Sequence, residues 1–280
     1  MSTPVIAAST VVVTLALPTN DAPAIGRLTR RGVVTMALMG MAAAILSFEV
    51  ASDTVDEHDD WHTHEHLPER LAIPGFLRGT RWVALDGSPR YFVLYEVEAL
   101  ATLSAAPYVE RLNNPTPWTS KMMTHYRGMT RGFCALTGSF GSGVGQAALW
   151  IRCKPAESLS ERLREWLVTD ALPRLPSLPG LGSAHLLEAA ATPPSTNEQR
   201  IRGVDSAMDW AVLVTGYSVE RLSELIVNAL SDANFRRQGT ADYVAGIYRM
   251  HHSLTRQEAT ASVKTVGAAR SASGPNAQSQ

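Results

Sequence analysis

A segment that occurs twice in the chain constrains its fold more than any other feature. Residues 61–75 share their frame with residues 166–180, 105 positions later. Trp61 corresponds to Trp166, and a Leu-Pro pair and then a Pro-Gly pair follow at matching positions in both copies. The copies differ at three histidines, since His62, His64 and His66 correspond to Leu167, Thr169 and Ala171. We interpret the shared residues, including both tryptophans, as scaffold and the differing ones as candidates for chemistry.

The hydrophobic pattern on either side of this segment predicts the order β-α-β-β-α-β twice. In the first copy we expect strands at 42–50, 76–85, 90–97 and 131–137, and helices at 53–71, 100–112 and 120–126. In the second we expect strands at 147–153, 181–188, 210–215 and 242–250, and helices at 159–172 and 219–230, with a longer loop at 191–206. The predicted fold class is therefore α+β, with two tandem ferredoxin-like units.

Two such units predict a barrel that one chain can form by itself. A single ferredoxin-like sheet has helices on one face and leaves the other bare, so packing two bare faces together buries both. A monomer can form this barrel, and further homo-oligomers stay open. The predicted boundaries are an N-terminal extension (1–40), unit 1 (41–137), a Gly/Ser linker (138–144), unit 2 (145–255) and a disordered tail (256–280).

Composition excludes several classes of protein. The chain of 280 residues is 45% hydrophobic and 18% charged, with a net charge of −1, which gives no electrostatic reason to bind nucleic acid or an anionic membrane. Cys134 and Cys153 form no CxxC or zinc spacing. An apolar run at 33–46 after Arg30-Arg31 is similar to a twin-arginine export signal, but the repeat assigns part of it to the first strand. We therefore predict a cytoplasmic protein that does not cross a membrane and whose residues 1–40 are poorly ordered.

Four segments carry a resemblance to a known superfamily. They are the run from Trp61 through Glu65-His66-Leu67-Pro68-Glu69-Arg70, and residues 73–76, 91–96 and 112–118. Over about residues 41–255 the chain resembles the dimeric α+β barrel superfamily, and within it EthD-like and related uncharacterised proteins. That superfamily includes cofactor-free isomerases, cyclases, decarboxylases and monooxygenases, haem-dependent enzymes, and proteins of no known activity. The resemblance thus implies a fold and a range of chemistries.

His66 is the first candidate for catalysis. It lies near the end of a predicted helix, just before Pro68, and the helix terminus together with Glu65 or Glu69 would favour its imidazolium form. Such a histidine can exchange a proton near neutral pH. The alternative is a surface or half-buried histidine that is hydrogen-bonded to a neighbouring carboxylate.

A stripe of histidines allows two further interpretations. His58, His62 and His66 recur every four residues and so share one helix face. Two of them could hold a divalent metal with Glu65 or His125, although all three span too long a distance for one ion. The simpler alternative is a solvated polar face, and we expect no metal.

Residues of the next two strands complete the predicted site. Arg78 and Arg81 point to opposite faces, and one of them could bind a substrate carboxylate; the alternative is a solvated arginine. Tyr91 or Tyr95 could donate a hydrogen bond to a developing oxyanion, or simply pack in the core.

The turn at 113–118 supplies the last candidates. Asn113, Asn114 and Trp118 lie in a rigid polar turn with two prolines, where they either border a pocket or cap backbone groups. The glycine-rich stretch 138–143 lacks the ending of a phosphate-binding loop, and we interpret it as linker.

Together these features predict a cofactor-independent acid/base enzyme, an isomerase, decarboxylase or other lyase. Its substrate would be a small oxygenated or aromatic catabolic intermediate carrying an acid or phenol group. His66, Tyr95 and Arg81 would be catalytic, and His62, Arg78, Tyr91, Asn113 and Trp118 would bind substrate. A non-catalytic small-molecule-binding or interaction protein is the first alternative, and a haem- or metal-dependent enzyme the second. A pocket containing a titration-shifted His66 would favour the enzyme, whereas a filled barrel with an exposed His66 would favour the binding protein.

Overall fold

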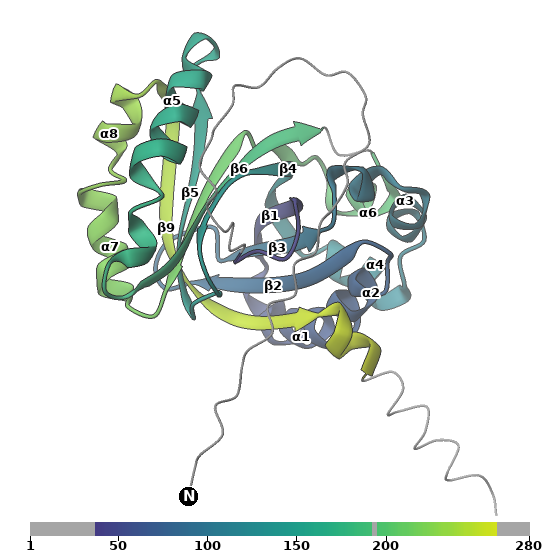
Figure 1. Ribbon diagram of the computed structural model, residues 1–280. Coiled ribbons are helices and arrows are strands. Elements are labelled where there is room, and N and C mark those ends of the chain that lie inside the picture. Colours follow the sequence, from purple (N-terminus) through teal and green to yellow (C-terminus); the bar gives the residue numbers. More distant parts are fainter. Residues whose placement is uncertain (1–36, 192–194, 262–280) are drawn as a thin grey trace, which may run out of the picture. The chain divides into compact units, whose positions relative to one another are not determined.

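The computed structural model describes residues 37–191 and 195–261. Within them, eight strands form a closed antiparallel barrel whose outer face is covered by helices (Figure 1). The order around the barrel is β1-β3-β2-β9-β5-β8-β6-β4, and β4 closes it by pairing with β1. The predicted α+β class, with a barrel formed by a single chain, is confirmed.

The first half follows the predicted order of elements. Its strands are β1 (Ala42–Val50), β2 (Phe76–Ala84), β3 (Tyr91–Val97) and β4 (Tyr126–Gly141). Its helices are α1 (Val55–Trp61), α2 (Leu67–Leu71), α3 (Ala106–Asn113) and α4 (Pro117–Met123), and a π-helical turn, His62–His66, joins α1 to α2. Every residue of β3 is buried, as expected for a strand covered by helices on one face and by the barrel core on the other.

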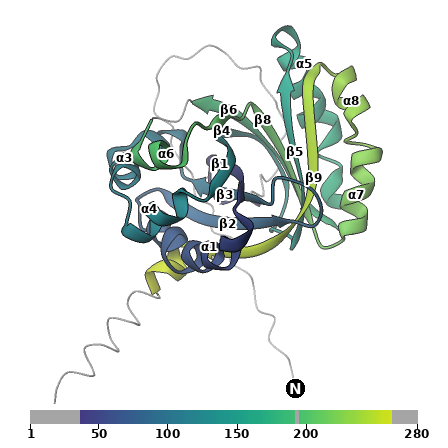
Figure 2. The same cartoon turned by 180° about the vertical axis from the view of Figure 1, so that it is seen from behind.

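The second half repeats this order with one addition. Its strands are β5 (Ala147–Pro155), β6 (Leu181–Ala191), β8 (Trp210–Gly216) and β9 (Thr240–Thr255), and its helices are α5 (Ser160–Trp166), α7 (Val219–Val227) and α8 (Asp232–Arg237). The longer loop before β8 carries α6 (Asn197–Arg202) and a two-residue strand, β7 (Ser206–Ala207), which pairs in parallel with β4. Figure 2 shows α6 beside α3 and α4 of the first half, and residues of α6 contact both of these helices.

Two long strands join the halves. β4 pairs with β1 over residues 126–135 and with β6 over residues 133–141. β9 likewise pairs with β5 over residues 240–249 and with β2 over residues 248–255. The linker predicted at 138–144 is therefore wrong over residues 138–141, because these residues continue β4 and pair with the second half.

The hydrophobic residues form three clusters. One lies between the helices and the outer face of the first half, and a second lies in the same place in the second half. The third combines strand residues from both halves and fills the barrel interior. Phe92 is at its centre, with ring centroids 5.5 Å from Trp82, 4.8 Å from Trp150 and 4.9 Å from Tyr248. The barrel interior is thus a packed core.

The described ends of the chain are more ordered than the sequence predicts. Ala37 and Leu38, assigned to a poorly ordered extension, are buried, and the Ala37 carbonyl accepts a hydrogen bond from Arg78. Residues 256–261, assigned to a disordered tail, are helical, and Ala259 packs against the first cluster. These corrections share one reason, since both segments bury apolar side chains. The rest of both predictions, residues 1–36 and 262–280, lies outside the described residues.

Candidate functional site

The first helix contains a π turn directly before a Leu-Pro pair. Leu67 N–H bonds to the carbonyl of His62, five residues earlier, instead of to the residue four earlier. Pro68 follows, and proline has no N–H and crowds the preceding turn of a helix. The second half has the same turn before the same Leu-Pro pair, with Leu172 N–H bonded to the carbonyl of Leu167 at 3.0 Å. A wider π turn therefore accommodates the proline in both halves.

The three spaced histidines face the sheet. His58, His62 and His66 are all buried, with ring centroids 5.6 Å apart for the first pair and 5.5 Å for the second. The predicted shared face exists, but the prediction that it is solvated is wrong. The reason is that this face packs against the sheet, whereas His64, between them in sequence, is exposed.

Close approach of the helix to β2 and β3 brings His62 to Tyr95. A β carbon at Gly79 would lie 2.3 Å from the end of the Leu67 side chain, so the glycine provides the space in which Leu67 packs against β2. Tyr95 projects from β3 toward the helix, and its hydroxyl lies 3.3 Å from Nε2 of His62. Both side chains are buried.

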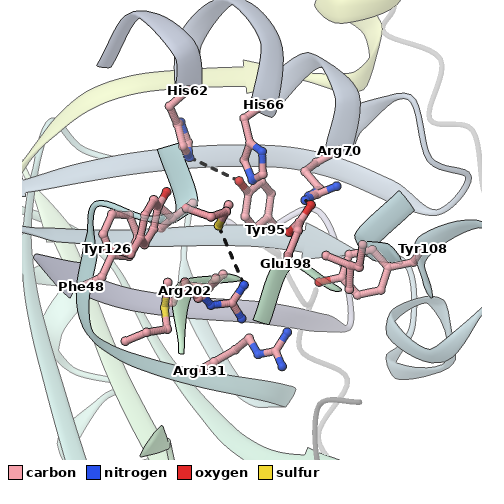
Figure 3. Close-up of a pocket in the computed structure, with 15 residues that line it drawn as sticks. Phe48, His62, His66, Arg70, Tyr95, Tyr108, Tyr126, Arg131, Glu198 and Arg202 are labelled. Atoms are coloured by element: carbon pink, nitrogen blue, oxygen red, sulfur yellow. Dashed lines mark hydrogen bonds and ion pairs between the residues drawn. The ribbon is translucent and has the colours of Figure 1, made fainter. Parts of the chain in front are cut away.

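A small cavity lies beneath this helix, outside the barrel (Figure 3). The space open to the centre of a water molecule is about 30 Å³, enough for one or two waters. Its polar lining comprises His62, His66, Arg70, Tyr95, Tyr108, Tyr126, Arg131, Glu198 and Arg202. Phe48, Met123 and Met129 contribute apolar walls, and methionine side chains can shift to admit a larger guest.

The second half closes this cavity of the first half. Glu198 and Arg202 both come from α6. Glu198 accepts a hydrogen bond from Arg70 Nη2 at 2.5 Å, and Arg202 donates two hydrogen bonds to Asp205, at 2.9 and 2.7 Å. Arg131 of β4 also pairs with Asp205, at 3.0 Å. The insertion in the second half therefore supplies charged residues to a site on the first.

Burial sets the protonation states in the cavity. It lowers the pKa of His62 and of His66 well below the usual histidine value, and the neighbouring Arg81 and Arg70 guanidinium groups, respectively, act in the same direction. Burial also raises the pKa of the Tyr95 hydroxyl. The expectation that His66 is an imidazolium is thus wrong. Glu65, invoked to stabilise that charge, instead accepts hydrogen bonds from Trp61, Thr116 and Thr119.

Several buried polar atoms at the cavity have no hydrogen-bond partner among the described residues. They are Nδ1 of His62, Nδ1 of His66 and Nη1 of Arg70. A buried polar group without a partner costs about 1–3 kcal/mol. Three such atoms around one space indicate that it holds polar guests, either water or a ligand.

The structure brings three of the predicted site residues together and separates the others. His62, His66 and Tyr95 line the cavity. Arg81 lies on the same side of the sheet but outside the cavity, where it donates hydrogen bonds to the Asp59 carbonyl and Thr63. Arg78 is on the opposite face, as predicted, and forms an ion pair with Glu96 at 2.6 Å. Both arginines therefore have structural partners.

The remaining predicted residues also lie outside the cavity. Tyr91 stacks on Phe48 with ring centroids 5.5 Å apart, and burial raises its pKa to about 12. Asn113 accepts two hydrogen bonds from Asn197, the first residue of α6, so it caps this helix, in line with the alternative interpretation. Trp118 donates a hydrogen bond to Glu57 at 3.2 Å. None of Tyr91, Asn113 and Trp118 lines the space beneath the helix.

Sequence reasoning missed the charged part of the site. Arg70, Arg131, Glu198 and Arg202 line the cavity, and none was a candidate. One signal could have found two of them, because the loop at 191–206 is longer than its counterpart in the first half. Its acidic and basic residues had no evident partner in their own half.

Residues 37–191 and 195–261 contain no group of three or more His, Cys, Asp and Glu side chains that is arranged to hold a metal ion.

No helix in the part of the chain that the structure describes is both long and apolar enough to span a membrane.

Comparison with known proteins gives matches in structure. No family model matches the chain, and no curated protein matches it in sequence. An anthrone oxidase-like protein superposes with a TM-score of 0.56 at 12% identity, covering 80% of this chain and 97% of that one. A candidate monooxygenase from Fusobacterium nucleatum subsp. nucleatum superposes with a TM-score of 0.53 at 7% identity, covering 78% and 96%. The chain thus shares the α+β barrel fold of monooxygenase-like proteins.

Proposed function

We propose that this protein is an acid/base enzyme that acts on a small oxygenated molecule in the cavity beneath the first helix. The observation that carries the proposal is a cavity lined by two buried imidazoles and a tyrosine hydroxyl, with the Tyr95 hydroxyl 3.3 Å from Nε2 of His62. The reaction class is isomerisation, decarboxylation or a related lyase step without a cofactor. The specific assignment to EthD-like proteins stays a prediction.

His66 is the proposed base. Its Nδ1 has no partner among the described residues, and its ring packs on Trp61 at a centroid distance of 4.3 Å. A neutral imidazole can take a proton from a carbon next to a carbonyl. The electrons of the broken C–H bond then move into the carbonyl and form an enolate. Where the substrate carries a C=C bond conjugated with this enolate, return of the proton from His66 to the far carbon of that bond shifts the double bond, completes an isomerisation and restores the enzyme.

Tyr95 is the proposed donor to the enolate oxygen. When His62 Nε2–H donates to the Tyr95 oxygen across their 3.3 Å contact, the tyrosine O–H is free for the substrate. Burial keeps this hydroxyl protonated, since it raises the tyrosine pKa. A fixed donor aimed at developing negative charge stabilises a transition state more than a mobile water does. His62 would act as a positioning residue.

A non-catalytic binding protein was the first alternative. It would combine a filled barrel with an exposed His66, and the barrel is indeed filled. His66, however, is buried, lines a cavity and has a pKa well below its usual value. Perturbed titratable groups in a cavity favour a functional site. This supports the enzyme over the binding protein.

A haem-dependent enzyme was the second alternative, and the lining residues do not fit a haem. A space of about 30 Å³ is a small fraction of what a porphyrin ring occupies. The lining also contains the buried ion pair between Arg70 and Glu198, whose charged groups do not match the apolar faces of a porphyrin ring. We therefore derive no step that involves haem.

Proton exchange tests the proposal whatever the product of the reaction is. A panel of small hydroxy acids, keto acids and phenols is incubated with the protein in D₂O, and NMR follows deuterium incorporation at carbon. We expect the wild-type protein to catalyse exchange in one class of compound. His66→Ala should lower that rate about 10²- to 10⁴-fold, the usual contribution of a general base. Tyr95→Phe should lower it as well, since the oxyanion loses its donor.

His64→Ala is the matched control. It changes a histidine of the same turn whose side chain faces solvent, so exchange should be unaffected. Unchanged exchange in His66→Ala would show that His66 is not the base. Absence of exchange with every compound would overturn the proposal and favour a binding protein.

A further inference from the structure

Among the residues that the structure describes, Arg70, Arg131, Arg202 and Glu198 line the cavity, and Asp205 pairs with two of these arginines. Arg70, Arg131 and Arg202 are each 3% exposed, and their partners Glu198 and Asp205 are 4% and 7% exposed. Within the described residues, these three arginines and two carboxylates have a net charge of +1. A buried net charge is unfavourable unless a charge of opposite sign compensates it. This site therefore favours an anionic guest.

Two arginine donors remain available toward the space. Arg70 uses Nη2 for Glu198, and its buried Nη1 has no partner among the described residues. Arg202 uses Nε and Nη2 for Asp205, and its Nη1 lies 4.0 Å from the sulfur of Met123, which is a weak acceptor. In Figure 3, Arg70 descends from the helix while Arg202 lies on the opposite side of the space.

We infer that the cavity binds the carboxylate of a small monoanionic substrate between Arg70 and Arg202. Each guanidinium N–H would donate to the carboxylate, a charge-assisted contact stronger than a neutral hydrogen bond. One negative charge balances the cluster, whereas a phosphate dianion would leave an excess of one negative charge. The small volume also favours a compact acid. This inference rests on the proposed function only in assigning the other end of the substrate to His66 and Tyr95.

The two arginines come from different halves of the chain. Arg70 belongs to the first helix, whereas Arg202 belongs to the insertion of the second half. The anion site is therefore complete only when α6 packs over the first half. Neither Arg78 nor Arg81, the predicted carboxylate-binding residues, takes part, because Glu96 and Asp59 occupy them. The second half lacks the histidines, but through Arg202 it contributes to the selection of an anionic substrate at the site on the first half.

Paired probes of equal shape and different charge test the inference. Binding of formate against formamide, and of acetate against acetamide, is measured by calorimetry at constant ionic strength. We expect the wild-type protein to bind each acid roughly tenfold or more tightly than its amide, because a hydrogen bond to a charged group contributes about 1.5–3 kcal/mol. Arg202→Met should remove this preference and leave amide binding unchanged. Equal affinity for acid and amide in the wild-type protein would overturn the inference.

The variants are chosen so that folding does not obscure the result. Arg202→Met leaves Asp205 paired with Arg131, so no carboxylate is stranded. Arg202→Lys keeps the charge but loses the planar fork, and should retain part of the preference; full retention of the acid preference in both variants would contradict the inference. Arg111→Met is the control, because Arg111 pairs with Glu69 outside the cavity and should not affect binding.

The experiment separates this inference from the proposed function. Preferential binding of acids without any carbon exchange would support the anion site and contradict the acid/base reaction. Exchange that depends on His66, together with equal binding of acids and amides, would support the reaction and contradict the anion site.

Discussion

The first helix and its counterpart in the second half have a π turn at matching positions and bury different side chains. Both contain a π turn directly before a Leu-Pro pair. The positions of His62, His66 and Arg70 correspond to three apolar residues of the second half, Leu167, Ala171 and Leu175. Tyr95 of β3 corresponds to Val214 of β8, which is buried in the second cluster. One helix therefore covers a polar cavity, and the other covers an apolar core.

This difference separates a structural feature from a functional one. π turns are frequent at functional sites. Here the same turn occurs over a core that has no titratable group corresponding to His62 or His66, so the proline explains the turn in both halves. The side chains presented by the turn, and not the turn itself, distinguish the two halves. Comparing halves within one chain thus supplies a control that a single site does not offer.

The largest effect is expected when the polar half loses one partner of its buried ion pair. Arg70→Met leaves the Glu198 carboxylate buried without its cation. Breaking a buried pair in this way costs about 3–5 kcal/mol. Urea denaturation should show a loss of this size in the free energy of unfolding.

The double variant Arg70→Met/Glu198→Met sharpens this result. It removes both charges and makes the first half resemble the second, where Leu175 is apolar. Most of the lost stability should return, since apolar residues of similar volume can replace a buried pair. A double variant as unstable as the single one would show that the pair is not the source of the loss.

A smaller loss is expected when the apolar half receives a histidine. Leu167→His would place an imidazole in the second cluster, where Val214 cannot act as the partner that Tyr95 provides for His62. A buried polar group without a partner costs about 1–3 kcal/mol. The midpoint of urea denaturation, measured at about pH 8 where the imidazole is neutral, should decrease accordingly. His62→Leu, the reverse exchange, should cost less; a larger cost would contradict our account of the polar half.

The smallest effect is the pH dependence of stability. The pKa values of His62 and His66 are lowered in the folded state, whereas in the unfolded chain both titrate near 6.5. Below about pH 6.5 the unfolded state therefore binds more protons, and stability falls as the pH decreases toward the folded-state pKa values. Each histidine contributes a slope of up to about 1.4 kcal/mol per pH unit.

Removing one of these histidines measures its share of that slope. His66→Leu should give a shallower decline of the free energy of unfolding between about pH 7.5 and about pH 5.5, the range around the unfolded-state pKa. His64→Leu is the matched control, because it replaces an exposed histidine of the same turn that does not line the cavity. Identical slopes in His66→Leu and wild type would show that His66 is protonated equally in both states.

The fold could be predicted from the sequence because its two copies share a frame. Trp61 and the Leu-Pro pair recur after 105 residues, and the apolar runs of β1 and β3 mark strands with two buried faces. The lengths of β4 and β9 could not be predicted in the same way. Their ends pair with strands of the other half, so the contacts that hold them are distant in sequence.

The site was predictable in part for the same reason. His62 and His66 stood out because the second copy lacks them, and Tyr95 because a tyrosine on the third strand could reach a neighbouring cleft. The helix terminus and the neighbouring glutamates favoured an imidazolium at His66, but burial of this helix face lowers the pKa of His66. Glu198 and Arg202 lie more than 100 residues from the helix that they contact. Only the folding of the chain brings these charges together.

The crossing of β4 and β9 between the halves has a consequence for how the chain unfolds. If one half unfolds, the other half loses strand pairing, because the end of β4 pairs with β6 of the second half and the end of β9 pairs with β2 of the first half. Loss of either half would leave a row of unpaired backbone groups along β2 or β6, and such edges promote aggregation. We therefore expect the described fold to unfold in a single cooperative transition. A fragment that ends between β4 and β5 would expose an unpaired strand edge that promotes aggregation.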